Sequence, residues 1–422
     1  MNKLQNLVSK LEKHHKRKID LTLDRTFNLL KKLGNPQDKI KNVINVVGTN
    51  AKASMSYSLK SILNEAGYKC NLYTSPHLQS FTERFIFDDK EIKEEELIEL
   101  LNDIEKVLGN DNASLFEILT CAFLKYAENY KDNINIIEAG LFFQFDSTNV
   151  FKHNLMTLIG VIHTDHLQWL KNKTIDGIIH EKTSKLLNSN IFINRQLNEE
   201  IRAKIEKALL NNSSNKYFFG KEFNISKQES GFILYQDDMG EIILPKPNLL
   251  GDHQLYNIST SIAASRKMFN VKDQHIKKGI TKIELKGRLQ ELTSGRLKEI
   301  SGQNRLIIDG GHNESSSISI SNWIKQQNQD VHIICGMMKD KEHYEFMKHF
   351  KDVVKSITLI DIPNQKGSIS KEEFKNKLNN LKMDINLSSS IQEAIKLNSK
   401  CQDSICLFAG SLYMVGEVLN LN

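Results

Sequence analysis

Cysteine is sparse in this chain of 422 residues, and long apolar runs are missing. The five cysteines form no C-x-x-C pair, so the sequence predicts neither a disulfide framework nor a zinc site. They are Cys70, Cys121, Cys335, Cys401 and Cys406. No apolar stretch approaches the roughly 20 residues that a transmembrane helix needs, and residues 1–18 lack the apolar core of a signal peptide. We therefore expect a cytoplasmic protein with no membrane partner.

Concentrated positive charge is also missing. Lys and Arg number 57 against 51 Asp and Glu, a net charge of +6, but the lysines are spread along the chain rather than gathered into a stripe. Such a dispersed excess is typical of a solvated surface, so we expect no nucleic-acid partner. Hydrophobic residues make up 40% of the chain and charged residues 26%, which is the composition of a globular protein.

The length of the chain predicts two domains, and its periodicity predicts the α/β class. Short β-rich segments alternate with helical ones, and residues 211–247 predict smaller strands that decorate the first domain. Polar and glycine-bearing triplets near residues 293–305 interrupt the pattern, so we expect domains at 1–295 and 296–422, the second one doubly wound. The predicted elements are strands over 42–47, 133–137, 155–162, 306–308, 332–335, 357–360 and 405–408, a strand ending at Tyr73, and a helix over 52–66.

The segment Gly48-Thr49-Asn50-Ala51-Lys52-Ala53-Ser54 lies between a predicted strand and a predicted helix. That is where a phosphate-binding loop belongs, because N–H groups at a helix N-terminus face an anion and lysine neutralises it. The generic pattern is not met, since Val46 and Ala51 stand at its glycine positions and Ala53 at its hydroxyl position. The pattern alone therefore favours an ordinary strand-to-helix turn.

Four further polar segments follow predicted strands, where ligands bind in α/β sheets. The segment 73–78 alone predicts a turn, and so does 309–313. Glu138 has the position of a carboxylate that organises Mg²⁺, and equally that of a capping or salt-bridging glutamate. His166, in Thr164-Asp165-His166, is at such a place more often structural than metal-binding.

Taken in order, these segments resemble the folylpolyglutamate synthase/dihydrofolate synthase family, within the Mur ligase superfamily of ATP-dependent amide-forming ligases. The resemblance extends from about Ile19 to Glu417. It implies a P-loop-type N-terminal ATPase domain and a smaller doubly wound, Rossmann-like C-terminal domain. The residues that carry it, besides those above, are Leu23-Asp24-Arg25, Gly34-Asn35-Pro36, Glu83-Arg84, Phe116-Glu117, Glu138-Ala139-Gly140-Leu141, Asp146-Ser147-Thr148-Asn149, Glu181-Lys182, Gly251-Asp252-His253-Gln254 with Asn257, Gly287-Arg288-Leu289-Gln290, Lys339-Asp340-Lys341, Gly410-Ser411-Leu412-Tyr413 and Val415-Gly416-Glu417.

The resemblance implies a ligase of folate biosynthesis. ATP would phosphorylate the carboxylate of dihydropteroate, and the amino group of glutamate would displace phosphate from the resulting acyl phosphate. Reduced folates are further candidate substrates. The implied ATP-binding residues are Gly48, Thr49, Asn50, Ala51, Lys52, Ala53, Ser54, Asn257, Arg288 and Asp309. The implied magnesium ligands are Ser54, Ser75, Glu138 and His166.

Lys52, Lys182 and His312 are the implied catalytic residues. Lys182 matches a carbamylated lysine of the family, although on its own it would be a surface lysine, and a monovalent cation is a further candidate cofactor. The implied substrate-binding residues are Ile19, Asp20, Leu21, Phe116, Glu117, Ile118, Leu119, Phe145, Asp146 and Ser147, with His312 and Ser411 for glutamate. We expect the active site in a cleft between the domains, where closure excludes water.

Three departures from the family pattern bear on these expectations. Ala51 and Ala53 replace two glycines of the phosphate loop. Alanine at a positive φ costs roughly 1–2 kcal/mol, so we expect ATP binding to be weakened rather than abolished. Phe142-Phe143-Gln144 replaces Gly-Gly-Arg, which removes a positive charge from substrate recognition, and His163-Thr164 replaces small apolar residues.

Two other functions remain open at this stage. One is a Mur-type ligase of a cell-wall peptide precursor, against which the segments 19–21 and 73–78 speak. The other is a nucleotide- or folate-binding relative with weakened or lost catalysis. The joint presence of Lys52, Glu138 and Lys182 with the Ser54 hydroxyl and the His166 imidazole speaks against it. We expect a monomer.

Overall fold

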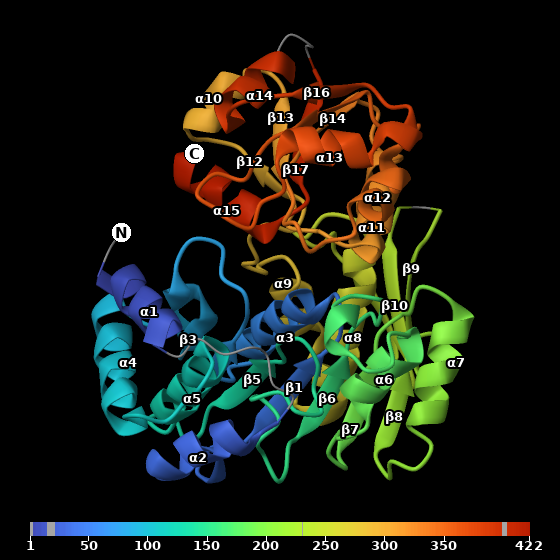
Figure 1. Cartoon of the computed structure of the whole chain (residues 1–422). Helices are drawn as coiled ribbons and strands as arrows, with labels where there is room; N and C mark the ends of the chain where they lie inside the picture. The colour runs from blue at the N-terminus through green and yellow to red at the C-terminus, as the bar shows by residue number, and fades with distance from the viewer. Residues whose placement is uncertain (1–2, 15–21, 230, 399–402) are drawn as a thin grey trace. The chain divides into compact units, whose positions relative to one another are not determined.

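The computed structural model describes residues 3–14, 22–229, 231–398 and 403–422. The chain divides into two compact units. The first comprises 1–248 and 255–284, and the second 249–254 and 285–422 (Figure 1). Within the described ranges, no helix is both long and apolar enough to cross a membrane.

The first unit is built on an eight-stranded sheet in the order β4-β3-β2-β5-β1-β6-β7-β8. The strands from β2 to β8 in that order are parallel, whereas β3 and β4 add an antiparallel edge. A separate antiparallel sheet has the order β11-β10-β9. The strands are β1 (Val43–Val47), β2 (Cys70–Tyr73), β3 (Phe85–Phe87), β4 (Lys90–Glu91), β5 (Ile134–Glu138), β6 (Met156–Ile159), β7 (Asn190–Ile193), β8 (Asn215–Phe218), β9 (Phe223–Lys227), β10 (Ile233–Asp237) and β11 (Gly240–Leu244).

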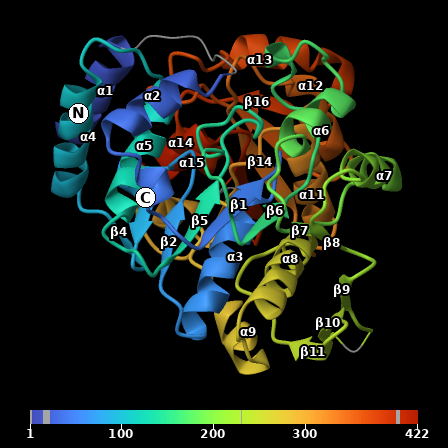
Figure 2. The same ribbon diagram turned by 90° about the horizontal axis from the view of Figure 1, so that it is seen from below.

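Helices cover both faces of the large sheet, as Figure 2 shows. On one side lie α3, α8 and α9, tied together by hydrogen bonds from Ser261 Oγ to Met55 O (2.9 Å) and from Ser61 Oγ to Gly279 O (2.7 Å). On the other side α5 packs on the sheet, with α6 and α7 farther along it. The helices are α1 (Lys3–His14), α2 (Asp24–Lys32), α3 (Lys52–Glu65), α4 (Glu94–Leu108), α5 (Leu115–Ala127), α6 (Ile175–Thr183), α7 (Glu199–Ala208), α8 (Asp252–Met268) and α9 (Asp273–Gly279).

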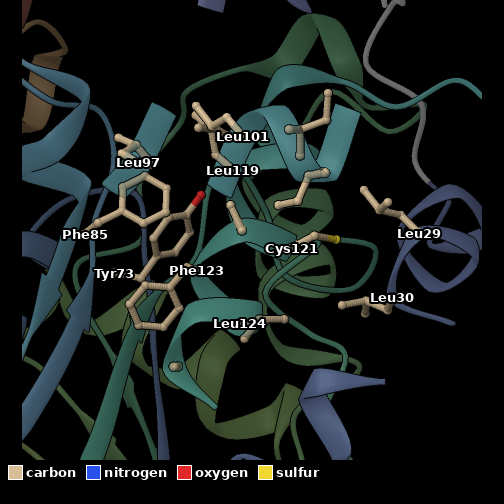
Figure 3. Packing of buried hydrophobic residues seen from close by; sticks show 14 of the residues in the cluster. Leu29, Leu30, Tyr73, Phe85, Leu97, Leu101, Leu119, Cys121, Phe123 and Leu124 are labelled. Atoms are coloured by element: carbon tan, nitrogen blue, oxygen red, sulfur yellow. The ribbon is translucent and has the colours of Figure 1, made fainter. Parts of the chain in front are cut away.

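One large core cluster of the first unit lies around α5. The apolar residues of α5 are buried on nearly every side, because the helix packs between the sheet and a layer formed by α1, α2 and α4. Figure 3 shows Phe123 beside Tyr73 and Phe85, with Leu29 and Leu30 of α2 approaching from the other side. This packing fixes the first turn of α5, where the predicted substrate-binding segment begins.

The second unit contains a six-stranded sheet in the order β12-β13-β17-β14-β15-β16. All neighbouring strands are parallel except β12, which pairs antiparallel with β13. Its core is formed by inward-facing aliphatic residues and by Trp323, Phe346 and Phe374 of the surrounding helices. The elements are β12 (Gln290–Leu292), α10 (Arg296–Ser301), β13 (Arg305–Ile308), α11 (Glu314–Ile324), β14 (Val331–Cys335), α12 (His343–Met347), β15 (Ser356–Leu359), α13 (Lys371–Lys377), β16 (Ile385–Leu387), α14 (Ile391–Asn398), β17 (Ile405–Ala409) and α15 (Leu412–Leu421).

The predicted α/β class and the strands predicted in both domains are confirmed, with ends that differ by a few residues. The predicted boundary between 295 and 296 lies later than the division at 284/285. The reason is β12, whose pairing with β13 places it in the sheet of the second unit. A strand of three residues, of which only Leu292 is apolar, carries no periodic signal that could be detected in the sequence.

Candidate active site

The carboxyl ends of β2, β5, β1 and β6 are neighbours along one edge of the large sheet. The phosphate loop 48–54 follows β1, Glu138 ends β5, and Ser75 and His166 follow β2 and β6. In the register of the sheet, Val46 of β1 pairs with Glu138 on one side and with Leu158 of β6 on the other. Parallel pairing therefore brings four separate polar segments to one edge, which is where open α/β sheets bind ligands.

The phosphate loop is held against the chain that follows β6. The backbone N–H groups of Thr49 and Asn50 both donate to Val161 O, at 2.9 and 3.1 Å. The hydroxyl of Thr49 donates to His163 O at 2.9 Å. Gly160 permits this approach, because a Cβ there would lie 2.3 Å from Asn50 O. These contacts set the path of the loop before any ligand binds.

The two alanines of the loop have different backbone conformations. Ala51 lies in the left-handed region, with φ 73° and ψ −12°, and precedes α3 as its N-cap residue. Ala53 lies within the first turn of α3 and has no positive φ. Of the two glycine replacements, the one at Ala51 therefore carries backbone strain, whereas alanine at Ala53 suits a helix.

The first turn of α3 offers donors to an anion. Peptide N–H groups in the first turn of a helix have no acceptor within the helix, and here that turn contains Lys52, Ala53 and the buried Ser54. The Lys52 ammonium donates to Gly48 O (3.1 Å) and Thr49 O (3.3 Å). It lies 4.0 Å from Glu138 Oε1, so a cation and a carboxylate stand side by side at the loop.

A second lysine joins the phosphate loop to the segment after β5. Lys182 of α6 is 3% exposed, and its ammonium donates to Gly48 O at 3.0 Å and to Leu141 O at 2.6 Å. Burial, followed by repulsion from the Lys52 ammonium, lowers the pKa of Lys182 to about 7. The side chain is therefore a buried amine rather than the surface lysine that its surroundings in the sequence alone would suggest.

The four predicted magnesium ligands lie on three of the adjacent segments and on α3. Glu138 is 3% exposed, and His166 is half-buried, with its backbone N–H donating to Asp165 Oδ1 at 2.9 Å. Ser75 lies between β2 and a histidine, His77, that accepts a hydrogen bond from Arg84 Nε at 2.9 Å. Burial lowers the pKa of His77 to about 3. Among the described residues, no three His, Cys, Asp or Glu side chains are grouped so that they could hold a metal ion alone.

The predicted substrate segment on α5 is divided between core and surface. Ile118 and Leu119 are fully buried in the core, so their side chains are not available to a ligand in this structure. The carboxylate of Glu117 accepts hydrogen bonds from Arg25 and from Ser114 N in a capping box. The half-buried ring of Phe116 remains as the part of this segment that a ligand could contact.

The segment after Gly140 folds around a buried carboxylate. Asp146 accepts hydrogen bonds from Gly140 N (3.0 Å), Thr148 N (3.0 Å) and Thr148 Oγ1 (2.6 Å), and burial raises its pKa. A Cβ at Gly140 would lie 2.9 Å from both Asp146 Oδ2 and Phe116 Cζ. The Phe116 ring and the Asp146 carboxylate therefore flank one glycine, with the exposed Phe145 next to them in the chain.

Of the remaining residues predicted to bind dihydropteroate, the structure describes Ser147. Ser147 is buried, and its Oγ lies 3.1 Å from Thr26 Oγ1, within hydrogen-bond distance. The predicted residues Ile19, Asp20 and Leu21 lie outside the described residues.

Asn257 of α8 lies near the same edge of the sheet. Its Oδ1 accepts a hydrogen bond from Asn194 Nδ2 at 2.8 Å, and Asn194 directly follows β7. In the next position, the Arg195 guanidinium lies 4.3 Å from the ring centroid of Tyr256. Of the nucleotide residues predicted in the first unit, the phosphate loop thus follows β1, and Asn257 contacts the residue that follows β7, on the other side of β6.

In the second unit, Asp309 organises the turn after β13. It is 4% exposed, accepts from Leu289 N (2.9 Å) and Gly311 N (2.7 Å), and burial raises its pKa against the opposing effect of Arg288. His312 Nδ1 lies 2.9 Å from Gly310 O, and because a carbonyl only accepts, Nδ1 is the protonated nitrogen.

Ser411, predicted to contact glutamate, is 3% exposed, and its hydroxyl accepts from Tyr413 N as the N-cap of α15. Its hydroxyl thus positions the first turn of that helix.

Two features of the site were not predicted from the sequence. Gly160 carries the close approach of the loop, and a glycine inside the β-rich run 155–162 was the available signal. The second is α2, whose Arg25 and Thr26 contact both predicted substrate segments. Arg25 was among the matched residues, but a single arginine on a short helix gives no sign of its partner.

The chain is similar in sequence and in fold to known proteins. The family model for the Mur ligase, glutamate ligase domain, matches residues 295–412. A dihydrofolate synthase/folylpolyglutamate synthase from Bacillus subtilis is 28% identical over 94% of both chains. The structure of Escherichia coli FolC in complex with DHPP and ADP is 25% identical, with a TM-score of 0.85, covering 99% of this chain and 97% of the other.

A second solved structure extends the similarity in fold. It is a bifunctional folylpolyglutamate synthase/dihydrofolate synthase from Yersinia pestis complexed with AMPPNP and Mn ion, 23% identical with a TM-score of 0.85, covering 100% of this chain and 98% of the other. Along nearly its whole length the chain is similar to members of the folylpolyglutamate synthase/dihydrofolate synthase family, and its residues 295–412 match the Mur ligase, glutamate ligase domain.

Proposed function

We propose that this chain is an ATP-dependent ligase that joins the carboxylate of dihydropteroate to the amino group of glutamate through an acyl phosphate. One observation carries the proposal. The phosphate loop, with Lys52 at 4.0 Å from Glu138, occupies the sheet edge at which Ser75 and His166 also arrive. The similarity to relatives named dihydrofolate synthase/folylpolyglutamate synthase, over 94% of the chain, supports the choice of substrates.

At the nucleotide, the residues of the first unit act by position and charge. The N–H groups in the first turn of α3 would bind the β- and γ-phosphates of ATP. Lys52 would exchange its bonds to Gly48 O and Thr49 O for bonds to phosphate oxygens and so balance the charge that develops in the transition state. Asn257 would bind a part of ATP other than the β- and γ-phosphates. Arg288 and Asp309 of the second unit are the other proposed ATP-binding residues.

The donor set fits a divalent cation of the Mg²⁺ type. Glu138, Ser54 and Ser75 supply oxygen atoms, which Mg²⁺ prefers, and His166 supplies one imidazole. A site with few protein ligands agrees with the absence of any larger acidic or imidazole group among the described residues, because Mg²⁺ keeps waters and binds phosphate oxygens. When bound, the cation would neutralise phosphate charge.

Lys182 is proposed to be carbamylated. Carbamylation requires a neutral amine, and the pKa of Lys182, lowered by burial to about 7, makes that form available near neutral pH. The carbamate would carry the negative charge that a metal ligand needs, in a position now occupied by an ammonium bonded to Gly48 O and Leu141 O. A monovalent cation remains a proposed further cofactor.

The binding site for dihydropteroate is proposed to lie around Gly140. An aromatic face such as that of Phe116 can stack on a pterin, and the Asp146 carboxylate can accept hydrogen bonds from the N–H groups at its edge. For the incoming glutamate, an Nδ1–H bond from His312 to Gly310 O would leave the lone pair of the imidazole on Nε2, which would accept the proton that the ammonium must lose. Ser411 would act with it on the glutamate.

The test is an assay of the full chain with ATP, Mg²⁺, dihydropteroate and glutamate. We expect dihydrofolate and phosphate in equal amounts, with each substrate required. Lys52→Ala should abolish turnover, and Lys60→Ala, which removes a lysine from the same helix, should retain it. Absence of both products with the unaltered chain would contradict the proposal.

Reduced folates are a second proposed substrate class, because the names of the similar relatives include folylpolyglutamate synthase. The same assay with tetrahydrofolate in place of dihydropteroate tests this class. Glutamate-dependent phosphate release would support it, and its absence beside active dihydropteroate turnover would restrict the chain to the first addition.

A further inference from the structure

The first turn of α2 contacts both segments that are proposed to bind dihydropteroate, residues 116–119 and residues 145–147. Arg25 forms a two-pronged hydrogen-bonded ion pair with Glu117, with Nη2 to Oε1 at 2.8 Å and Nε to Oε1 and Oε2 at 3.1 and 3.2 Å. The next residue, Thr26, is fully buried, and its hydroxyl lies 3.1 Å from that of Ser147. Adjacent residues of one helix are thus joined to 116–119 and to 145–147.

In the Arg25–Glu117 pair the carboxylate is buried and fully engaged, and the guanidinium is partly buried. The side chains are 14% and 6% exposed, and Glu117 also accepts from Ser114 N in the capping box of α5. An ion pair of this geometry fixes direction as well as distance, because the planar guanidinium matches the carboxylate. Its effect is to fix the first turn of α5, and with it Phe116.

The helix that makes these contacts is itself rigidly held. Leu29 and Leu30 are 1% and 0% exposed and belong to the core cluster that contains Cys121 and Leu124 of α5 (Figure 3). Because α2 is anchored through this face, its first turn can hold both segments at a constant separation. Phe116 and Asp146 meet at Gly140, where a single added Cβ would be too close to both.

We propose that Arg25 and Thr26 are positioning residues for the dihydropteroate site, holding Phe116 and the 145–147 segment at the separation that the pterin needs. The inference rests on the proposed function, since it names the substrate whose binding is positioned. Neither residue needs to touch the substrate. Misplacement of the two segments would weaken the binding of dihydropteroate and leave the conformation of the phosphate loop unchanged.

The experiment compares Glu117→Gln and Thr26→Val with a matched control, Asp237→Asn. Asp237 is a buried carboxylate that forms an ion pair with Arg266, 3.2 Å from its Nε, with side chains 2% and 7% exposed, and it lies on β10 rather than in either segment. We expect the KM for dihydropteroate to rise roughly tenfold in the first two variants, with the KM for ATP unchanged, because displaced binding groups cost affinity steeply. Asp237→Asn should lower the melting temperature and leave both KM values unchanged.

Amide hydrogen exchange gives an independent readout that does not depend on turnover. Exchange at 115–119 and 141–149 should quicken in Glu117→Gln and Thr26→Val but not in Asp237→Asn. An unchanged KM for dihydropteroate with unchanged exchange at both segments, or an equal rise of both KM values, would overturn the positioning role. Absence of turnover in the unaltered chain would instead contradict the proposed function.

Discussion

At the scale of single residues, the two alanines of the phosphate loop should respond in opposite ways to replacement by glycine. Ala51 at φ 73° pays for a left-handed conformation, whereas Ala53 lies within α3. We expect Ala51→Gly to raise the free energy of unfolding by about 0.5–1 kcal/mol and Ala53→Gly to lower it by a similar amount. Urea unfolding of both variants measures this difference.

ATP affinity completes that comparison. Restoring both glycines should leave ATP affinity equal or higher, since the glycine at position 51 removes a side chain beside the loop. A clear loss of affinity would show that the loop has been rebuilt around alanine. Equal changes of stability in the two single variants would contradict the assignment of strain to Ala51.

Lys182 gives a prediction for the pH dependence of stability. Its pKa is about 7 in the folded chain, against an ordinary value of 10.5. Between these values the unfolded chain binds a proton that the folded chain does not, so the free energy of unfolding should rise with pH from about 7 to about 10. Lys182→Met should reduce this rise, and urea unfolding across that range in CO₂-free buffer would measure it. Equal slopes for the two proteins would contradict the buried-amine state.

At the scale of elements, the approach of the phosphate loop to the end of β6 is sensitive to added volume at Gly160. In Gly160→Ala the new Cβ would lie 2.3 Å from Asn50 O, a backbone atom, so the loop must move. We expect a loss of stability of about 1–3 kcal/mol together with weaker ATP binding. Isothermal titration with ATP and urea unfolding would measure the two effects.

Gly279→Ala is the matched control for that substitution. Its Cβ would lie 2.7 Å from the backbone of Ile62, where α9 crosses α3, so a similar loss of stability is expected. ATP affinity should stay near that of the unaltered chain, because the contact is distant along α3 from the loop. Equal ATP affinities in both variants would show that the Gly160 contact does not shape the site.

Much of the element pattern could be predicted from the sequence, because buried parallel strands such as 405–409 are continuous apolar runs and α3 has a clear helical period. The edge strand β12 could not be predicted, since it is short, has a single apolar residue and depends on its pairing with β13. The same holds within the site. Glu117 was predicted as a ligand contact, but its partner Arg25 lies 92 residues away in the sequence, and only the fold shows that the carboxylate is engaged.

At the scale of the whole molecule, each unit contributes its own part of the proposed chemistry. The first holds the phosphate loop, the proposed metal ligands and the acceptor segments, and the second holds Arg288, Asp309 and His312. The family model covers 295–412, within the second unit, while the similarity to the Bacillus subtilis relative covers 94% of the chain. The proposed reaction therefore requires both units, and its central step is transfer of phosphate to the carboxylate of dihydropteroate.

Oxygen-isotope transfer tests that step most directly. Dihydropteroate labelled with oxygen-18 in its carboxylate is incubated with the full chain, ATP, Mg²⁺ and glutamate, and the released phosphate is analysed by mass spectrometry. An acyl phosphate route places one labelled oxygen in each phosphate, since the carboxylate oxygen leaves with it, and Lys52→Ala should release no labelled phosphate. Unlabelled phosphate released in step with dihydrofolate would contradict the acyl phosphate.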